Sequence, residues 1–240
     1  MALLQNTGSI EQLISTKSKI RSTPKSYYRN SNYYELSKYQ LNYIKYYKPS
    51  FEIFLLIIMS PAILPIFMVT FLIVFFTSGA PVFFKQLRIG YAEKDFLMYK
   101  FRTMTHSKRN EYIKEDKVYV SPNGSLVEQL TEEKITWIGK YLRKASIDEL
   151  PQLINILNGT MSLIGPRPVM HFFSTPYDNI SYRRYSVKPG ITGLYQVNSR
   201  ARFQTTLDMM IYDDQYIKNI GFWSDLKIIF KTIPALFWGE

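Results

Sequence analysis

An apolar segment from Phe51 to Phe76 constrains the fold of this chain more than any other feature. It reads FEIFLLIIMSPAILPIFMVTFLIVFF. A helix needs roughly 20 apolar residues to cross a hydrocarbon core of about 30 Å, and this segment is long enough. A secretory signal peptide lies at the N-terminus behind a short charged region. This segment starts too deep in the chain and lacks that short region, so it is not a signal peptide. The chain therefore belongs at a membrane.

Ser60-Pro61 interrupts this segment near its middle, and Pro65 follows. Proline inside a helix removes a backbone hydrogen bond and clashes with the preceding turn, so we expect a bend. Positive residues flank the segment on both sides, as is typical of cytoplasmic flanks. They are Lys38, Lys45 and Lys48 before the segment and Lys85, Arg88, Lys94, Lys100 and Arg102 after it.

Both observations fit a re-entrant helix-break-helix over residues 46–80 that enters and leaves by the cytoplasmic face. The Ser60 hydroxyl is then a suitable partner for a backbone carbonyl that proline leaves free. A proline-kinked helix that spans the bilayer is the alternative. The first arrangement predicts a monotopic protein of a cytoplasmic (inner) membrane, with its catalytic domain on the cytoplasmic face.

The rest of the chain is expected to comprise a polar, tyrosine-rich tail over residues 1–45, without a core of its own, and a catalytic domain over residues 81–240. A net charge of +11 suits an anionic partner. The membrane segment favours lipid headgroups or phosphorylated metabolites over nucleic acid, which we do not expect as a partner. The chain contains no cysteine, and His106 and His171 are too few and too far apart to indicate zinc.

Local patterns predict an α+β, mostly helical enzyme with a small β-hairpin. Residues 81–104 are rich in β-favouring aromatics around a Gly90 turn, and residues 105–134 read as a polar, exposed excursion. Two helices should follow, one through Trp137 and Leu142 and one through Leu150 and Leu157. The segment 223–238 has the pattern of an interfacial helix, and packing against the core is the alternative.

The acidic pair Asp148-Glu149 has two structural explanations. Asp148 precedes Leu150-Pro151, where a helix N-cap is expected, and Ser146 with Glu149 has the spacing of a capping box. The surrounding arginines favour a functional explanation, because guanidinium groups bind phosphate oxygens in pairs and stay charged. They are Arg102, Arg143 and Arg167.

Several motifs in order resemble the bacterial sugar transferase family, the monotopic phosphoglycosyl transferases, over roughly residues 46–233. Besides Ser60-Pro61 they comprise Pro81-Val82-Phe83-Phe84-Lys85-Gln86, Lys100-Phe101-Arg102-Thr103-Met104, Asp148-Glu149-Leu150-Pro151-Gln152, Gly165-Pro166-Arg167-Pro168 and Lys188-Pro189-Gly190-Ile191-Thr192-Gly193. The chain looks like a small member that contains the catalytic module. In that family the membrane element is a helix-break-helix that penetrates one leaflet.

The resemblance implies transfer of a phosphosugar from a UDP-sugar to polyprenyl phosphate, with release of UMP. Asp148 would be the nucleophile, and Glu149 would bind Mg²⁺ together with Asp148 or assist the acceptor. Lys85, Arg88, Lys100, Arg102, Arg143 and Arg167 would neutralise phosphate charge, and Lys188, Gln196 and Arg200 would contact the substrate. Membrane lipids and downstream glycosyltransferases are the further partners that this reaction implies.

The sequence departs from the family pattern at four positions. Glu93 and Ser199 stand where glycine is usual, Trp137 where a basic residue is usual, and Thr160 where aspartate is usual. Two other functions are compatible with a basic, membrane-attached chain. One is a scaffold without catalysis, and the other is a nucleic-acid or lipid-binding module, which would bind oligonucleotides with a steep salt dependence. The motifs name neither the sugar nor the glycan pathway.

Overall fold

The computed structural model of this chain describes residues 36–104, 118–120, 126–128, 135–170, 183–199 and 206–237. Within these ranges the protein is mostly helical with small two-stranded sheets, which confirms the predicted fold class. The helices are α2 (Lys38–Asn42), a π-helical turn (Tyr43–Tyr47), α3 (Lys48–Ser78), α4 (Trp137–Lys144), α5 (Gln152–Leu157), α7 (Leu194–Ser199), α8 (Thr206–Lys218) and α9 (Phe222–Phe237). The strands are β1 (Phe83–Ile89), β2 (Asp95–Phe101), β3 (Val118–Val120), β4 (Leu126–Glu128), β5 (Ser162–Ile164) and β6 (Gly190–Thr192).

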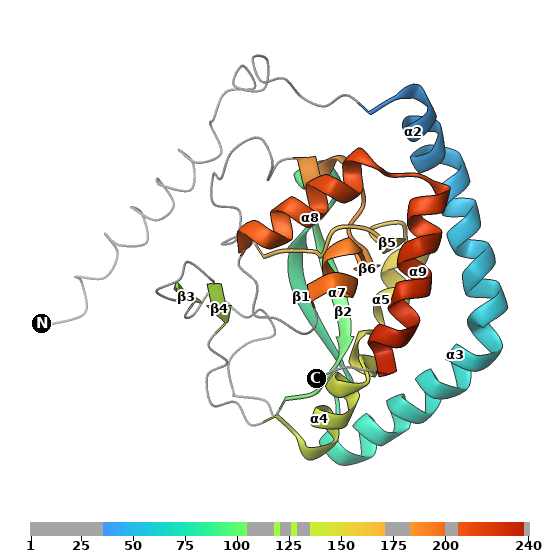
Figure 1. Ribbon diagram of the computed structural model, residues 1–240. Coiled ribbons are helices and arrows are strands. Elements are labelled where there is room, and N and C mark those ends of the chain that lie inside the picture. Colours follow the sequence, from blue (N-terminus) through green and yellow to red (C-terminus); the bar gives the residue numbers. More distant parts are fainter. Residues whose placement is uncertain are drawn as a thin grey trace, which may run out of the picture. The chain divides into compact units, whose positions relative to one another are not determined.

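Helix α3 contains the whole apolar segment and remains helical through Pro61 and Pro65. Figure 1 shows that it bends, running down one side of the picture and then turning across its lower edge. Pro61 has no N–H to donate to the carbonyl of Ile57 one turn earlier. The Ser60 hydroxyl donates to that carbonyl instead, at 2.7 Å, as predicted. The segment therefore bends while it stays helical, and the Ser60 hydroxyl satisfies the carbonyl that Pro61 leaves free.

Both ends of α3 pack against the domain that follows it. Near its start, Lys48 and Glu52 are buried, and near its end Val74 is fully buried in a cluster with Phe101 and Leu142. Between these ends most side chains are exposed, and only 11% of its most apolar stretch is buried. By length and composition the helix could cross a membrane. The exposed middle of an apolar helix is thus held at both ends by one folded unit.

Strands β1 and β2 form the predicted hairpin, with Phe84 opposite Lys100 and Arg88 opposite Phe96. Its turn holds two non-glycine residues in the left-handed region, Ala92 at φ 54° and Glu93 at φ 59°. Glycine adopts that conformation without steric cost, which explains why glycine is usual in the family at the position of Glu93.

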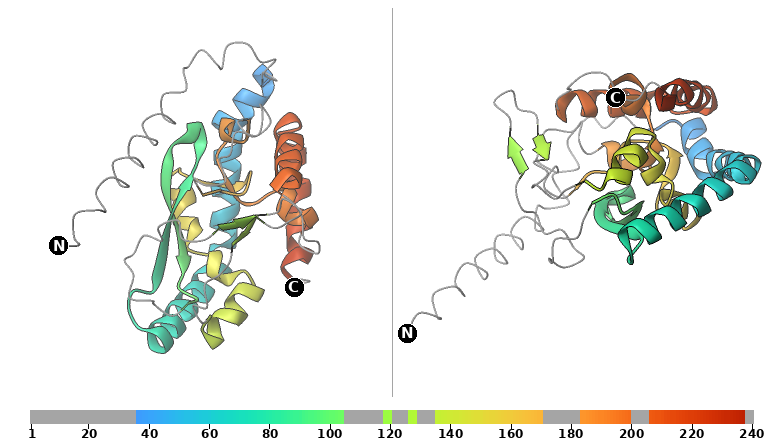
Figure 2. Two further views of the ribbon diagram at one scale, coloured as in Figure 1. Left: turned by 90° about the vertical axis from the view of Figure 1, so that its left-hand side faces the viewer. Right: turned by 90° about the horizontal axis from the view of Figure 1, so that it is seen from below.

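A second small sheet joins two of the family motifs. Strands β5 and β6 are parallel; Gly165 directly follows β5, and Gly190 is the first residue of β6. A Cβ atom on Gly190 would lie 2.1 Å from the amide nitrogen of Gly165. Only glycine permits this approach, in which the N–H of Gly190 donates to the carbonyl of Pro166 at 2.9 Å. Figure 2 shows the β1–β2 hairpin and α9 on opposite sides of α5, β5 and β6.

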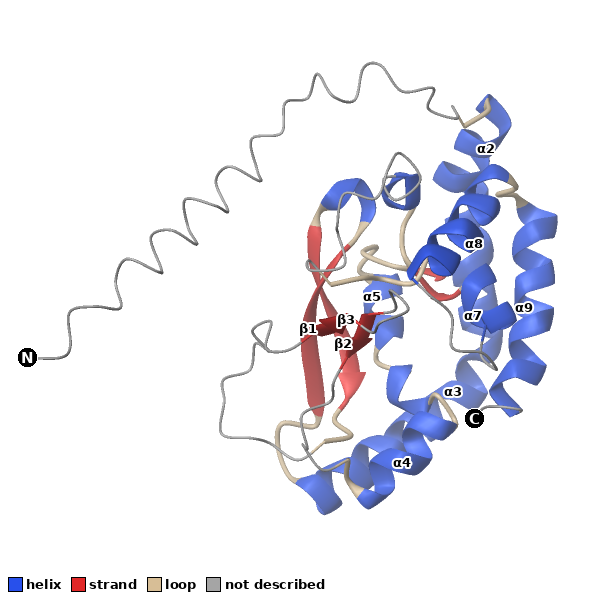
Figure 3. Cartoon of the chain, turned by 60° about the vertical axis from the view of Figure 1, so that its left-hand side comes forward, coloured by secondary structure: helices blue, strands red, loops and turns tan. Residues whose placement is uncertain are grey.

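Helices α8 and α9 lie on the side of α5 away from the β1–β2 hairpin, as Figure 3 shows. Their buried residues Tyr216, Ile217 and Ile228 form one core cluster with Ile164 and Tyr43. Tyr43 is 3% exposed, so the end of the predicted tail packs into the core of the domain that follows it. Residues 38–47 form α2 and the π-helical turn, and Tyr43 is the buried residue of that turn.

Helix α9 combines the two arrangements considered for the C-terminal segment. Ile228 is buried in the core, whereas Trp223, Phe230 and Ile233 are at least half exposed. Its position at a membrane interface stays a prediction. The polar excursion over residues 105–134 contains the short β3–β4 hairpin, and its other residues lie outside the described ranges.

Candidate active site

Asp148 and Glu149 lie in a 3₁₀ turn, Ile147–Glu149, between α4 and α5. Neither structural explanation for the pair holds in the described part of the chain. Ser146 adopts a left-handed conformation and makes no side-chain cap bond, and the residue at the N-cap position of α5 is Pro151. The pair is thus held at the junction of two helices without capping either of them.

Glu149 brings together three motifs that are far apart in the sequence. Its Oε1 lies 2.8 Å from Lys100 Nζ on β2 and 3.8 Å from Arg167 Nη2 in the Gly165–Pro168 loop. The Lys100 and Glu149 side chains are about four-fifths buried, whereas that of Arg167 is 45% exposed. Two cations therefore surround one carboxylate, and one of them faces solvent.

Asp148 is 7% exposed. Burial raises the pKa of its carboxyl above the usual value, and Glu149 raises it further, while the ammonium of Lys100 and the guanidinium of Arg143 act in the opposite direction. Arg143 is oriented by a hydrogen bond from its Nε to Thr103 Oγ1 at 2.9 Å. The charged form of Asp148 is thus favoured by two cations from separate elements, β2 and α4.

A pocket opens beside Glu149. Arg88 contributes to its wall, and Arg88 Nη1 donates to the carbonyl of Pro168 at 3.3 Å. The other lining residues are Met98, Lys100, Glu149, Gln152, Arg167, Pro168, Gly190 and Ile191. Three of the predicted phosphate-binding residues, Arg88, Lys100 and Arg167, therefore meet in one pocket.

Two predicted phosphate ligands lie elsewhere. Side chains alternate between the faces of a strand, and in the observed register Lys85 lies on the face of the hairpin opposite Arg88 and Lys100. Its ammonium is 5.8 Å from the ring centre of Tyr99. Arg102 donates from Nη2 to the carbonyls of Ser78 and Gly79, the latter at 2.6 Å, so it binds the C-terminal end of α3.

The residues predicted to contact the nucleotide or sugar are spread more widely. Lys188 Nζ lies 3.6 Å from where a Cβ of Gly159 would stand, at the end of α5. Gln196 on α7 is 8% exposed, and its amide atoms have no hydrogen-bond partner among the described residues. Arg200 lies outside the described ranges. The roles of all three residues stay predictions.

The family model for bacterial sugar transferases matches residues 43–239. The chain belongs to this family. It is 40% identical over 175 residues to the uncharacterized sugar transferase EpsL of Bacillus subtilis (strain 168), covering 73% of this chain and 79% of that protein. It is 39% identical over 176 residues to a UDP-glucose:undecaprenyl-phosphate glucose-1-phosphate transferase of Klebsiella pneumoniae, covering 70% of this chain and 35% of that enzyme.

The length of the relatives varies. The exopolysaccharide production protein ExoY of Rhizobium meliloti (strain 1021) is 36% identical over 177 residues, which cover 72% of this chain and 77% of ExoY. In contrast, the match spans only 36% of the galactosyl transferase CpsE of Streptococcus agalactiae serotype III (strain NEM316). The chain thus corresponds to most of the shorter relatives and to about a third of the longer ones. The predicted family and its transferase character are confirmed.

Sequence reasoning missed several residues that position the site of this sugar transferase. Arg184 donates from Nη2 to the carbonyl of Arg167 at 2.6 Å and pairs with Asp213 of α8 at 3.0 Å. Asn155 of α5 bonds the backbone of Tyr99 and Leu97, which fixes α5 against β2. A polar residue between Ile154 and Ile156 was the available signal for Asn155, and no local spacing links Arg184 to Asp213.

The acidic pair fits only one kind of metal site. Among the described residues, no group of three or more His, Asp or Glu side chains is gathered in one place. A Mg²⁺ ion typically uses one or two carboxylates and takes its other ligands from substrate phosphates and water. Asp148 and Glu149 can supply those carboxylates, and Glu149 lines the pocket together with Arg88, Lys100 and Arg167.

Proposed function

We propose that this protein transfers a phosphosugar from a UDP-sugar to polyprenyl phosphate and releases UMP, through a covalent intermediate on Asp148. The observation that carries the proposal is the convergence of Lys100, Glu149 and Arg167 beside Asp148, at a pocket lined with cations. The names of relatives support it, because those from Klebsiella pneumoniae and Aeromonas hydrophila both specify a UDP-sugar and undecaprenyl phosphate.

The reaction divides into two displacements at phosphorus. First, a carboxylate oxygen of Asp148 attacks the β-phosphorus of the UDP-sugar, and the bond from that phosphorus to the bridging oxygen breaks. UMP leaves with the bonding electrons, and an acyl-phosphate remains on Asp148. Next, an oxygen of polyprenyl phosphate attacks the same phosphorus and restores the Asp148 carboxylate. One site can thus accept a nucleotide and a lipid in turn.

The pocket cations suit a substrate whose charge lies on phosphate oxygens. Lys100 and Arg167 already flank Glu149, and Arg88 lies at the pocket wall, so a diphosphate would meet positive charge on several sides. Asp148 must be deprotonated to attack. Lys100 and Arg143 favour that form against burial.

Mg²⁺ is the proposed cofactor, held by Asp148 and Glu149. When bound, it would offset the repulsion between these carboxylates and the incoming diphosphate. Glu149 alternatively assists the acceptor phosphate, and its contact with Lys100 at 2.8 Å is compatible with either role.

The attachment of α3 supports a re-entrant arrangement in the membrane. Both ends of this helix are buried in the same domain, so a helix whose exposed middle enters one leaflet and returns needs no rearrangement of that domain. The positive flanks of the helix support a domain on the cytoplasmic face. Exposed Trp137, Tyr141 and Trp223 are residue types that favour the headgroup region. A lipid-linked product formed there would be the substrate of downstream glycosyltransferases.

The direct test is UMP release by the detergent-solubilised protein with polyprenyl phosphate and Mg²⁺. The donor panel should contain UDP-glucose, UDP-galactose and UDP-N-acetylgalactosamine, since relatives are named for glucose, galactose and N-acetylgalactosamine. We expect one donor to dominate, and Asp148→Asn to lose at least about 10³-fold in rate. Asp95→Asn, at the exposed end of the hairpin, is the matched control.

Two results would contradict the proposal. UMP release that survives Asp148→Asn would exclude Asp148 as the nucleophile. No release from any donor, by a folded protein that still binds lipid vesicles, would favour a scaffold without catalysis.

A further inference from the structure

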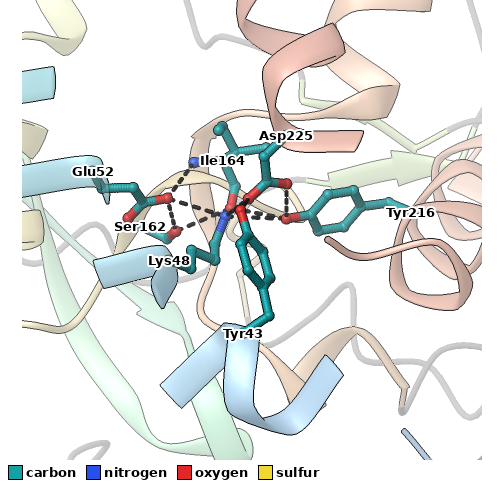
Figure 4. A network of polar contacts seen from close by, with 7 residues as sticks. All are labelled: Tyr43, Lys48, Glu52, Ser162, Ile164, Tyr216 and Asp225. Atoms are coloured by element: carbon teal, nitrogen blue, oxygen red, sulfur yellow. Dashed lines mark hydrogen bonds and ion pairs between the residues drawn. The ribbon is translucent and has the colours of Figure 1, made fainter. Parts of the chain in front are cut away.

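A sealed group of charges joins the start of α3 to α9, which we call the helix-anchor cluster. It comprises Lys48 and Glu52 of α3 and Asp225 of α9, which are 6%, 4% and 0% exposed. Figure 4 shows how they converge with Tyr43, Ser162, Ile164 and Tyr216. Buried charges are tolerated only where partners satisfy them, so each contact in this cluster matters for folding.

The side chains that bond the Asp225 carboxylate lie outside the small sheet, although the Tyr216 hydroxyl also lies 3.3 Å from the carbonyl oxygen of Ile164 in β5. Lys48 Nζ donates to its Oδ2, Tyr43 donates to the same atom at 2.8 Å, and the Tyr216 hydroxyl lies 2.9 Å from Oδ1. Burial and the neighbouring Asp225 raise the pKa of both tyrosines, so their hydroxyls stay protonated donors. Asp225 therefore completes the attachment of α3 to α9.

Glu52 reaches in a different direction. Besides its ion pair with Lys48 at 3.1 Å, its Oε1 lies 2.5 Å from Ser162 Oγ and accepts from the N–H of Ile164 at 3.3 Å. Both of these groups belong to β5. A carboxylate of the membrane helix thus holds the strand of the second sheet.

That strand leads directly into the Gly165–Pro168 loop. Arg167 follows Ile164 by three residues, so a shift of β5 moves Arg167 relative to Glu149. The far side of the loop is held by the buried Arg184, which donates to the carbonyl of Arg167 at 2.6 Å. The loop is fixed at its start by Glu52 and at Arg167 by Arg184.

We infer that Glu52 is a positioning residue for Arg167, and that the membrane helix thereby takes part in phosphate binding through its contact with β5. The inference rests on the proposed function for the role of Arg167. It differs from a purely structural role, in which loss of the Glu52 contact would lower stability without a specific effect on phosphate binding.

A double-mutant cycle between Ser162 and Arg167 tests the inference. Ser162→Ala removes one hydrogen bond to Glu52 and leaves every charge in place. Dissociation constants for UDP are measured by calorimetry on the full-length protein in detergent, for the wild type, both single variants and the double variant. kcat and KM are measured alongside from UMP release.

We expect Ser162→Ala to weaken UDP binding about 5-fold. In an Arg167→Ala background the same substitution should change it less than about 2-fold, because the residue being positioned is gone. The expected kinetic signature is a larger rise in KM than fall in kcat. Glu52→Gln, which keeps the length of the side chain, should show the same coupling if it folds.

Tyr43→Phe is the matched control, because it also removes one hydroxyl from the cluster but contacts Asp225 instead of β5. It should lower thermal stability and leave UDP binding within about 2-fold of wild type. Equal effects of Ser162→Ala with and without Arg167, or a UDP defect in Tyr43→Phe, would overturn the inference.

The proposed function can fail separately. A wild type that binds UDP without releasing UMP would contradict the transferase activity, while the cycle on UDP binding would still decide the role of Glu52. A wild-type protein that neither binds UDP nor releases UMP would overturn both the proposed function and the inferred role of Glu52.

Discussion

The helix-anchor cluster and the acidic pair use the same residue types at similar distances. Lys48 lies 3.1 Å from Glu52, and Lys100 lies 2.8 Å from Glu149. The side chains of the first pair are 7% and 5% exposed, whereas those of the second are 20% and 19% exposed. In the first, hydroxyls and an N–H from the protein complete the contacts; in the second, a pocket and the half-exposed Arg167 remain for a ligand.

This difference distinguishes a charged pair with a structural role from one with a candidate catalytic role. A sealed pair whose oxygens are bonded to the protein stabilises a junction between elements, and it has no room for substrate. A pair at a pocket, beside a buried carboxylate whose pKa is raised, is a candidate for chemistry. The two clusters should therefore respond in opposite ways to equivalent substitutions.

The largest effect is expected for Lys48→Met. This substitution leaves Glu52 and Asp225 buried without their common cation and should lower the free energy of unfolding by about 3–5 kcal/mol. Thermal unfolding in detergent measures it. Lys45→Met, one turn earlier on an exposed surface, is the control and should change stability by less than about 1 kcal/mol. A similar loss for both would mean that the cluster is not sealed.

Lys100→Met should impair activity much more than stability. We expect stability to change by about 1 kcal/mol or less, because the pair is partly exposed, while kcat/KM falls about 10²-fold through lost stabilisation of phosphate charge. Unfolding curves and UMP release are compared on the same preparation. Normal turnover in this variant would remove Lys100 from the site and leave the contrast between the clusters unsupported.

Asp148→Asn should raise thermal stability at pH values above the folded-state pKa of Asp148, although we expect it to lose activity. The folded-state pKa of Asp148 is above its unfolded value, so the folded state holds the proton more tightly. The stability that this carboxyl contributes is therefore complete below the unfolded pKa and is lost as the pH rises through the folded one.

Asparagine cannot ionise, so the stability gain of Asp148→Asn over the wild type should grow as the pH rises from the unfolded-state pKa through the folded-state pKa of Asp148. Wild-type activity should increase over the same pH range, because the nucleophile ionises. Unfolding midpoints and UMP release against pH provide the measurement. A variant less stable than wild type at every pH would make Asp148 a structural carboxylate like Glu52.

The smallest effect concerns a polar contact within the apolar helix that joins the two clusters. Ser60→Ala leaves the Ile57 carbonyl without the partner that replaces the missing Pro61 N–H, and should cost about 1 kcal/mol. Thr77→Val removes a similar bond, to the carbonyl of Ile73, which also has a normal helical donor. Equal losses in the two variants, measured in lipid nanodiscs, would show that the proline is irrelevant to the Ser60 contact.

Much of the local structure could be predicted because its causes lie within a few residues. Pro61 removes a donor from its own helix, and the alternation of Phe96 and Met98 places both side chains in the core. The acidic pair was identified because its motif resembles a family, whereas local spacing also allowed capping roles that the fold does not use.

Arg102 and Lys85 show the limit of that reasoning. Both occur in motifs beside phosphate-binding candidates, but the register of the hairpin turns Lys85 to the other face, and Arg102 binds the end of α3. A motif specifies residue types in order, and the direction of each side chain depends on which elements pack around it.

The sequence by itself determined the membrane helix, its bend, the hairpin and the family. Only the tertiary structure decided that Lys48 meets Asp225, 177 residues away, and that Glu52 holds the strand that leads to Arg167. The physical reason is range. Propensity, proline geometry and apolar periodicity act over one or two turns, whereas the partner of a buried charge is chosen by the packing of whole helices and strands.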